Sequence, residues 1–490
     1  MFRSGRLEKV YKNGFAIAIL LFVLFFHSRN SPQQQGLLSF PQSSSDQGPK
    51  RLRRPLDSPD LHIHEMMNLL FDPAQEDRLD FVRLGYQLRF YKKLHNIVLK
   101  AQQEKAPSKW TELEKESSRW LGVIDEHLFH WIGPTFHSTL QLESVFKGRG
   151  IVVCVYNDYV PLAMGNLQIV RTVLGSELPI EVFYMGDNDL SESNRKILET
   201  IPNLTTRNIL EIFDDEDINM SGWAIKAFAL MASSFQEAIL MDADVIFLQK
   251  PESLFKSLIY QEKGALFFQD RTMYTVNFQS LKKAVQWIAD VLPKPFKVSL
   301  HSRFAAMESS HQQESGVVVI DKKKRFTGLL ATCLLNVDEV RNVAYSHMYG
   351  DKETFWIGFE IVREPYGWNP FIPGAIGKHT VTKDGMYEIC SVQMIHVDEF
   401  ERPVWINGGM AKNKLLGDFS IQPFEEYLLE SRHNSLKSSD WSMHGTEFCM
   451  KSPEKPNKMT SWGLDVIKKA SPIVQKFFQD ETIKDFEVDY

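Results

Sequence analysis

The sequence predicts an α/β fold built on a mostly parallel, Rossmann-like sheet between residues 148 and 415. The first observation is that short apolar runs alternate with helical segments, which is typical of parallel sheets with right-handed crossovers. The second is that residues 150–156 are almost entirely apolar, as expected of a strand covered on both faces. The third is Asp242-Ala243-Asp244, which ends another apolar run and places two carboxylates at a strand's carboxyl end, where such sheets bind ligands.

Composition and missing motifs exclude several classes of protein. The 490 residues carry a formal net charge of −6 and 43% of them are hydrophobic, which is ordinary for a globular protein and gives no basis for binding nucleic acid. Neither GxGxxG nor the P-loop pattern GxxxxGK occurs, so dinucleotide enzymes and P-loop NTPases fit poorly. The 4 cysteines include no CxxC pair, which argues against zinc and allows one or two disulfides whose pairing the sequence leaves open.

Residues 1–60 predict a cytoplasmic tail (1–12), a transmembrane signal anchor (13–28) and a flexible stem (29–60). Basic residues precede the apolar run at 14–26 and no small-x-small cleavage pattern follows it, which favours an uncleaved anchor over a signal peptide. The run is shorter than a usual span of about 20 residues, which suits the thinner bilayers of the early secretory pathway. The stem is rich in Ser, Gln and Pro, and its basic cluster at 50–54 is either a protease-processing site or a solvated charge run.

Residues 61–147 predict a helical subdomain. Asp72-Pro73 with Gln75, and Thr111 with Glu114, are helix-start signals of the capping-box type. Apolar residues then recur at helical spacing after each signal, and the aromatic ones among them are interpreted as core packing.

The predicted catalytic domain spans 148–415. Strands are expected at 150–156, 179–185, 238–242, 265–269 and 316–320, with helices at 161–175, 191–200 and 223–235. The C-terminal extension, 416–490, is polar and ends in an acidic stretch, so it is expected to wrap the catalytic domain or to form a rim for an acceptor. No chemistry is assigned to it.

Asp242 and Asp244 are the leading candidates for a metal site. Side chains two apart on an extended strand point to the same side, about 6–7 Å apart, and paired carboxylates suit a hard divalent cation that carries phosphate oxygens. A solvated turn after the strand is the alternative. His396 ends the apolar run 394–395 and is a candidate third ligand, because imidazole also binds manganese; a core histidine is the competing interpretation.

Other residues are placed to bind a nucleotide and its phosphates. Tyr156, at the end of the first strand, is expected to stack on the base, and Asp158 to accept a hydrogen bond from the base or the ribose. Lys226 lies on the helix that precedes Asp242 and would reach a phosphate, although a lone helical lysine is more often solvated. The glycine-containing segment 403–409 predicts a flexible flap, followed by Lys412 and Lys414, which would neutralise a leaving diphosphate.

Three acidic residues are candidates for catalysis. Asp351 and Glu353 begin a helix, where they either bind acceptor hydroxyls and stabilise an oxocarbenium-like transition state or simply complement the helix dipole. Glu314 precedes Gly316, which allows close approach of a sugar.

In order and spacing these segments resemble the fungal Golgi α-1,3-mannosyltransferase family, whose members are type II membrane glycosyltransferases with a DxD motif. The resemblance covers about 150–415 and is carried by 223–226, 240–247, 314–321, 350–356 and the strand of His396.

The resemblance implies a nucleotide-sugar glycosyltransferase fold and a retaining, Mn²⁺-dependent enzyme. Such an enzyme transfers mannose from GDP-mannose to mannose-terminated N- or O-linked glycans of proteins in the Golgi lumen, with Asp242 and Asp244 carrying the metal. Three alternatives stay open: an α-1,2-mannosyltransferase of the same superfamily, a non-catalytic lectin, and a scaffold subunit in a complex with other Golgi transferases.

Overall fold

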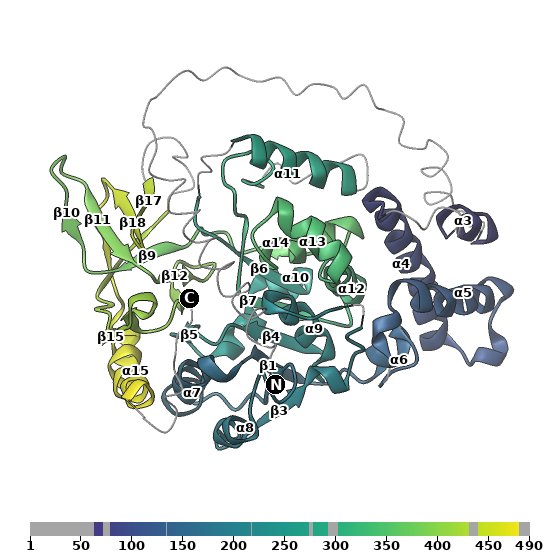
Figure 1. Ribbon diagram of the computed structural model, residues 1–490, viewed down its shortest axis with the longest axis horizontal. Coiled ribbons are helices and arrows are strands. Elements are labelled where there is room, and N and C mark those ends of the chain that lie inside the picture. Colours follow the sequence, from purple (N-terminus) through teal and green to yellow (C-terminus); the bar gives the residue numbers. More distant parts are fainter. Residues whose placement is uncertain are drawn as a thin grey trace, which may run out of the picture.

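The computed structural model describes residues 63–71, 79–133, 135–216, 218–273, 278–292, 302–430 and 440–479 (Figure 1). The predicted tail, anchor and stem, and the capping signal at Asp72, lie outside these residues. Within the described part of the chain, no helix combines the length and the apolar character that a membrane span requires.

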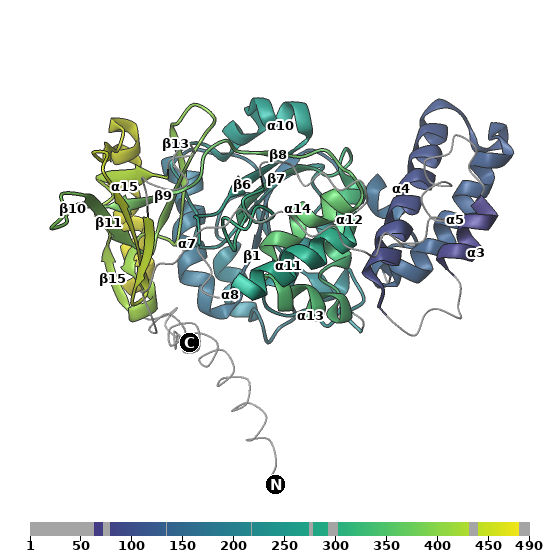
Figure 2. The same ribbon diagram turned by 90° about the horizontal axis from the view of Figure 1, so that it is seen from above.

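The region 61–147 is helical where it is described. Its main helices are α3 (Ile63–Leu70), α4 (Phe81–Glu104), α5 (Glu112–Leu128) and α6 (Thr139–Ser144). Helix α4 begins at Phe81 because Asp80 caps it by accepting hydrogen bonds from the backbone N–H groups of Val82 and Arg83. The capping box predicted at Thr111 and Glu114 is present at the start of α5. Figure 2 shows these helices at one end of the molecule.

A seven-stranded sheet forms the centre, in the order β3-β2-β1-β4-β7-β6-β8. Its strands are β1 (Arg149–Cys154), β2 (Ile180–Tyr184), β3 (Leu204–Asn208), β4 (Glu237–Met241), β6 (Ala265–Gln269), β7 (Gln313–Asp321) and β8 (Gly367–Trp368). Every neighbouring pair is parallel except the two that β7 makes, with β4 and with β6. The predicted mostly parallel sheet is therefore confirmed. Because β7 runs the other way, its first residues lie at the same edge as the last residues of β4 and β6.

Both faces of this sheet are covered, as the apolar run at 150–156 predicted. Alternate residues of β1 belong to different cores, with Val152 on one face and Ile151 and Val153 on the other. The first face packs against α9 (Ile225–Ala232), α12 (Phe326–Leu334) and α14 (Lys352–Ile361). The second packs against α7 (Val160–Gln168) and α15 (Ser461–Gln479). Helices α8 (Glu192–Leu198), α10 (Leu258–Lys263), α11 (Phe278–Val291) and α13 (Asp338–His347) complete the set in Figure 1.

A second, six-stranded sheet has the order β19-β16-β9-β12-β13-β5. Its strands are β5 (Ile246–Phe247), β9 (Gly374–Gly377), β12 (Met394–Val397), β13 (Pro403–Asn407), β16 (Glu426–Leu429) and β19 (Asn457–Lys458). The predicted flap at 403–409 is therefore wrong for most of its length, because β13 pairs on both sides and its residues 403–406 are buried. Only Gly408 and Gly409 form a turn, with φ of 102° and 75°.

The described part of 416–490 is built into the same body. Strand β16 pairs with β9, and β18 (Glu447–Ser452) pairs with β11 (Tyr387–Ser391) between β10 (Thr380–Val381) and β17 (Asp440–His444). A separate two-stranded sheet is formed by β14 (Ala411–Asn413) and β15 (Asp418–Ile421). A boundary at 415 therefore does not separate independent sheets.

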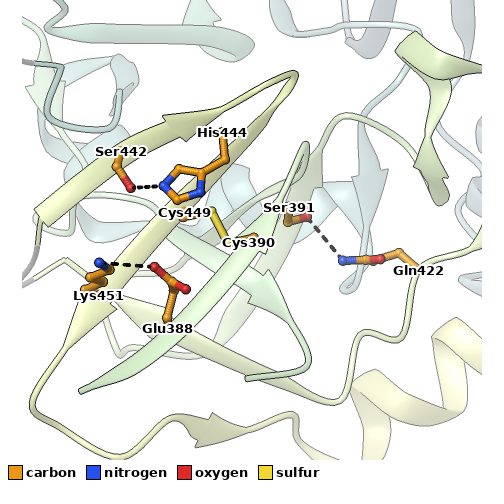
Figure 3. The surroundings of a disulfide bond; sticks show 8 residues. All are labelled: Glu388, Cys390, Ser391, Gln422, Ser442, His444, Cys449 and Lys451. Atoms are coloured by element: carbon orange, nitrogen blue, oxygen red, sulfur yellow. Dashed lines mark hydrogen bonds and ion pairs between the residues drawn. A yellow bond between two sulfur atoms is a disulfide. The ribbon is translucent and has the colours of Figure 1, made fainter. Parts of the chain in front are cut away.

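A disulfide between Cys390 and Cys449 links β11 to β18 (Figure 3). The two residues are direct cross-strand partners, which is the pairing that the sequence left open. Cys154 and Cys333 are free thiols.

Candidate functional site

The candidate site lies at one edge of the central sheet, where β1, β4 and β6 end and β7 begins. Tyr156 follows β1, Asp242 and Asp244 follow β4, Asp270 follows β6, and Glu314 is the second residue of β7. Because β4 and β7 are adjacent, the backbone N–H of Asp242 donates to the carbonyl of Gly316 at 2.9 Å. The antiparallel course of β7 thus brings Glu314 beside Asp242.

Asp242 is held by Lys226. The Nζ of Lys226 lies 2.7 Å from one carboxylate oxygen of Asp242 and 2.8 Å from the other, 3.3 Å from Ser315 Oγ and 3.9 Å from Asp351. Burial opposes the charge on Lys226, but the adjacent Asp242 and Asp351 carboxylates raise its pKa above the ordinary value. Lys226 is therefore a cation fixed at the sheet edge and not a solvated helical lysine, and its contact with a phosphate stays a prediction.

Asp244 is held by the segment 409–414, which follows β13 and includes β14. Its carboxylate forms an ion pair with Lys414, and its backbone carbonyl accepts a hydrogen bond from Gly409 N–H at 2.7 Å. Lys412 does not share this position. It is exposed and lies 3.9 Å from Asp418, so the structure brings Lys414, and not Lys412, to the carboxylates that follow β4.

Asp351 and Glu314 complete the acidic edge. Asp351 is buried and accepts a hydrogen bond from Ser315 Oγ at 3.2 Å. Glu314 accepts from the backbone N–H of Gly316 at 2.8 Å. Burial, together with the charges of Asp270 and Asp242, raises the pKa of Glu314 to about 7. Glu314 can therefore exchange a proton near neutral pH, whereas Asp351 lies close to the Lys226 cation.

Glu353 does not face this edge, and its predicted role in catalysis is wrong. Its side chain is 0% exposed and accepts hydrogen bonds from the backbone N–H of Gln312 at 2.8 Å and from the indole N–H of Trp356. Both carboxylate oxygens therefore already accept hydrogen bonds within the protein. Glu353 stabilises the segment that leads into β7 and is not positioned to bind a ligand.

A pH prediction follows from the burial of Glu353, which raises its pKa from 4.5 to about 7. Because the folded state binds the proton more tightly than the unfolded state, this residue makes the free energy of unfolding fall as pH rises from 4.5 to 7, by about 3 kcal/mol. Chemical denaturation of Glu353→Gln and wild type across this range should show the variant gaining relative stability with pH. A constant difference between the two proteins would contradict the assignment.

His396 is buried in the core, which favours the interpretation of a core histidine, and its role as third metal ligand stays a prediction. It is 2% exposed, and its ring stacks on Trp405, its cross-strand partner, with centroids 3.7 Å apart. Phe268 packs edge-on against both rings. Among the described residues, the ligand atoms of Asp242, Asp244 and His396 are not gathered within 4.8 Å, and the one trio that is, Glu388, His444 and Cys449, includes a disulfide sulfur (Figure 3).

The substitution His396→Phe tests this assignment. Because phenylalanine keeps the stacked ring and removes only the nitrogens, we expect the stabilisation of the protein by a divalent cation with a nucleoside diphosphate to survive. Thermal denaturation with and without these ligands measures it. If the substitution abolished the shift while Trp405→Phe preserved it, His396 would be a ligand after all.

Sequence reasoning missed a second charged cluster beside Glu314. Asp270 lies 2.7 Å from Lys352 and 3.2 Å from His311, and Arg271 follows it. Burial opposes ionisation of Asp270, but Lys352 and His311 hold its pKa well below the usual range. Only the fold reveals this cluster, because Asp270 ends β6 while His311 and Lys352 lie far along the chain. Asn407, at the end of β13, also reaches the edge, within 3.3 Å of where a Cβ on Gly316 would lie.

Tyr156 stands where a base was expected to stack. Its ring is 43% exposed and lies against Tyr159 with centroids 4.6 Å apart. Asp158 is half-buried in the 3-10 turn Asn157–Tyr159 between them. An accessible aromatic face one strand away from Asp242 is compatible with a nucleotide.

Asp242 and Asp244 fit a divalent cation. Burial, together with the nearby charge of Asp244, raises the pKa of Asp242 to about 6, even though Lys226 opposes this shift. A cation between the two carboxylates would relieve their mutual repulsion, and oxygen ligands suit Mg²⁺ or Mn²⁺.

Three comparisons bear on identity. The family model described as "Mannosyltransferase putative" matches residues 148–398, just over half of the chain. Alpha-1,3-mannosyltransferase MNT3 of Saccharomyces cerevisiae is 30% identical over 330 residues, covering 59% of this chain and 51% of that protein. Alpha-1,3-mannosyltransferase MNN1 of the same yeast is 24% identical over 378 residues, covering 66% of this chain and 47% of that protein. The chain thus spans about half the length of these relatives.

A solved structure of Core-mannan synthase A from Aspergillus fumigatus, in its Mn/GDP form, covers 49% of this chain and 75% of its own, with 13% identity. The TM-score is 0.29, which is too low to support a further conclusion.

Proposed function

We propose that this chain, which belongs to the mannosyltransferase family whose model matches residues 148–398, is a retaining α-1,3-mannosyltransferase that uses GDP-mannose. Its acceptor would be a mannose-terminated N- or O-linked glycan on a protein. The observation that carries the proposal is the pair of carboxylates at the end of β4, each neutralised by its own lysine. That arrangement has the charges that a metal-bound diphosphate requires.

Asp242 and Asp244 would hold the metal, with Mn²⁺ as the proposed ion. When bound, such an ion acts as a Lewis acid for the departing diphosphate. Lys226 orients Asp242 through an ion pair, and Lys414 does the same for Asp244. As the donor binds, both ammonium groups would also lie near the phosphates, where negative charge grows in the transition state.

Retention requires either a carboxylate nucleophile near the anomeric carbon or attack from the leaving-group face. Asp351 is the stronger candidate for a nucleophile, because it lies 3.9 Å from the Lys226 ammonium group and is oriented by a hydrogen bond from Ser315 Oγ. Glu314, with its pKa raised to about 7, is better suited to share a proton with a sugar hydroxyl. Tyr156 and Asp158 are proposed to bind the guanosine.

The proposed location is the Golgi lumen, with the chain anchored as a single-pass type II protein and open to complexes with other transferases. The disulfide between Cys390 and Cys449 supports an oxidising compartment, because such bonds persist in the secretory pathway and are rare in the cytosol.

The test is an assay of the purified full chain with Mn²⁺, a panel of nucleotide sugars and α-mannoside acceptors. Release of GDP from GDP-mannose, enhanced by a mannoside, would establish the reaction, and linkage analysis of the product would distinguish α-1,3 from α-1,2 transfer. A folded protein that binds mannosides but turns over no donor would instead be a lectin or a scaffold subunit.

A further inference from the structure

Two large aromatic rings lie exposed and in contact beside the candidate site. Trp223 is 40% exposed and Tyr349 is 54% exposed, and their ring centroids are 5.3 Å apart. Single exposed aromatic residues are common on protein surfaces and need no explanation. Two rings that form one accessible surface at the border of a charged site are less ordinary.

The backbone next to Asp351 makes room for Trp223. Trp223 lies three residues before Lys226, in the 3-10 turn Gly222–Ala224 that leads into α9. Its ring packs on Gly350, the neighbour of Asp351, so closely that a Cβ at Gly350 would lie 2.8 Å from Trp223 Cε3. Gly350 also has φ of 67°, which a residue with a side chain rarely adopts. The indole is therefore fixed within one residue of the acidic edge.

Tyr349 is fixed from behind by the second charged cluster. Its ring stacks on that of His311 with an interplanar angle of 16° and centroids 5.8 Å apart, and Lys352 Nζ lies 5.4 Å from its centroid. His311 and Lys352 both contact the buried Asp270. One face of Tyr349 is thus held by partly buried polar groups, while the residue itself stays 54% exposed.

The order of strands separates this pair from the nucleotide. Tyr156 and Tyr159 follow β1, and the aspartates follow β4. Behind Tyr349, His311 precedes β7 and Asp270 follows β6. Neighbouring strands are about 4.8 Å apart, so the two aromatic pairs lie on opposite sides of the aspartates. With the base over β1 and the diphosphate at β4, the sugars belong over β7 and β6.

We propose that Trp223 and Tyr349 form the platform that binds a pyranose ring of the mannoside acceptor. This inference rests on the proposed function. The C–H face of a pyranose is apolar and matches an aromatic surface, while its hydroxyl groups suit the charged side chains that lie beside the rings. The platform would hold the acceptor in position against the donor sugar, which is how binding geometry contributes to rate.

The experiment uses the full chain and two readouts, the KM for an α-1,2-mannobiose acceptor and the Kd of GDP with Mn²⁺ from calorimetry. We expect Tyr349→Ala and Trp223→Ala to raise the acceptor KM about 10-fold each, with the Kd of GDP within about 2-fold of wild type. Tyr349→Phe should keep the wild-type KM, because it retains the ring. Tyr156→Ala is the matched comparison and should instead weaken GDP.

Several results would overturn the proposal. If Tyr349→Ala weakened GDP and left the acceptor KM unchanged, the pair would stack on the base. If neither the acceptor KM nor the Kd of GDP changed, the two rings would be exposed residues without a role in binding. Should the wild type transfer no mannose, the proposed function fails separately, and calorimetric binding of mannobiose then decides. Binding that Tyr349→Ala weakens would support the platform, and absent or unaffected binding would refute it.

Discussion

Asp244→Asn should reduce mannosyl transfer at least about 1000-fold while leaving the fold intact. Asparagine keeps the size and one oxygen of aspartate but removes the charge that a divalent ion requires, and loss of a charged group that acts in the transition state typically costs several kcal/mol. The carboxylate is at the sheet edge and the backbone contact from Gly409 is unaffected, so the core loses nothing. Initial rates of GDP release at saturating Mn²⁺ measure the effect.

Asp418→Asn is the matched control for this substitution. Asp418 is also an aspartate with a lysine nearby, Lys412 at 3.9 Å, and its carboxylate accepts hydrogen bonds from Ser420, which is not a residue of the candidate site. We expect its transfer rate to match wild type within about 2-fold. In Asp244→Asn, the rise in melting temperature that GDP and Mn²⁺ cause in wild type should also disappear, since a ligand bound only by the folded state stabilises it. Undiminished transfer by Asp244→Asn would end the metal-site interpretation.

The central sheet could be predicted because its strands are short apolar runs that carry their own signal. The strand at 265–269 and the end of the strand before Asp242 agree with β6 and β4 to within a residue. The apolar pattern does not indicate whether a strand runs parallel or antiparallel to its neighbours. Nothing in 313–321 indicates that β7 runs antiparallel, yet this direction places Glu314 and Ser315 at the site. For the same reason Asp270 and Lys352, far apart in sequence, could not be recognised as a pair.

Side-chain direction limited the prediction in the same way. Lys412 and Lys414 are two residues apart and would point to the same side of a continuous strand. Strand β14 ends at Asn413, however, and a 3-10 turn begins at Lys414, so only Lys414 turns toward Asp244. His396 lies in an apolar strand as predicted, but strand alternation leaves two faces to choose from, and it lies on the face of Trp405 and Phe268. Local sequence identified the segments, and packing decided which atoms meet.

Lys226→Met should abolish transfer and also destabilise the protein. The substitution keeps the apolar stem of the side chain but leaves Asp242 and the buried Asp351 without their shared cation. Removing one partner of a buried ion pair costs about 3–5 kcal/mol, and the partial exposure of Asp242, whose side chain is 25% accessible, reduces this figure. We therefore expect a loss of about 2 kcal/mol in the free energy of unfolding, measured by urea denaturation without metal or nucleotide.

The double variant Lys226→Met/Asp242→Asn separates the two effects. It removes both members of the pair and with them most of the unpaired charge, so it should recover much of the stability that Lys226→Met loses, while transfer stays absent because the metal ligand is gone. Lys412→Met, which replaces an exposed lysine with a distant partner, should change neither property.

If Lys226→Met were as stable as wild type and still transferred mannose, the cation would be a surface charge and the edge of β4 would need another group to balance its carboxylates. Mn²⁺ should restore part of the lost stability in Lys226→Met, because a divalent ion can balance the carboxylate charge that the lysine no longer offsets, and the same addition should do nothing for the double variant.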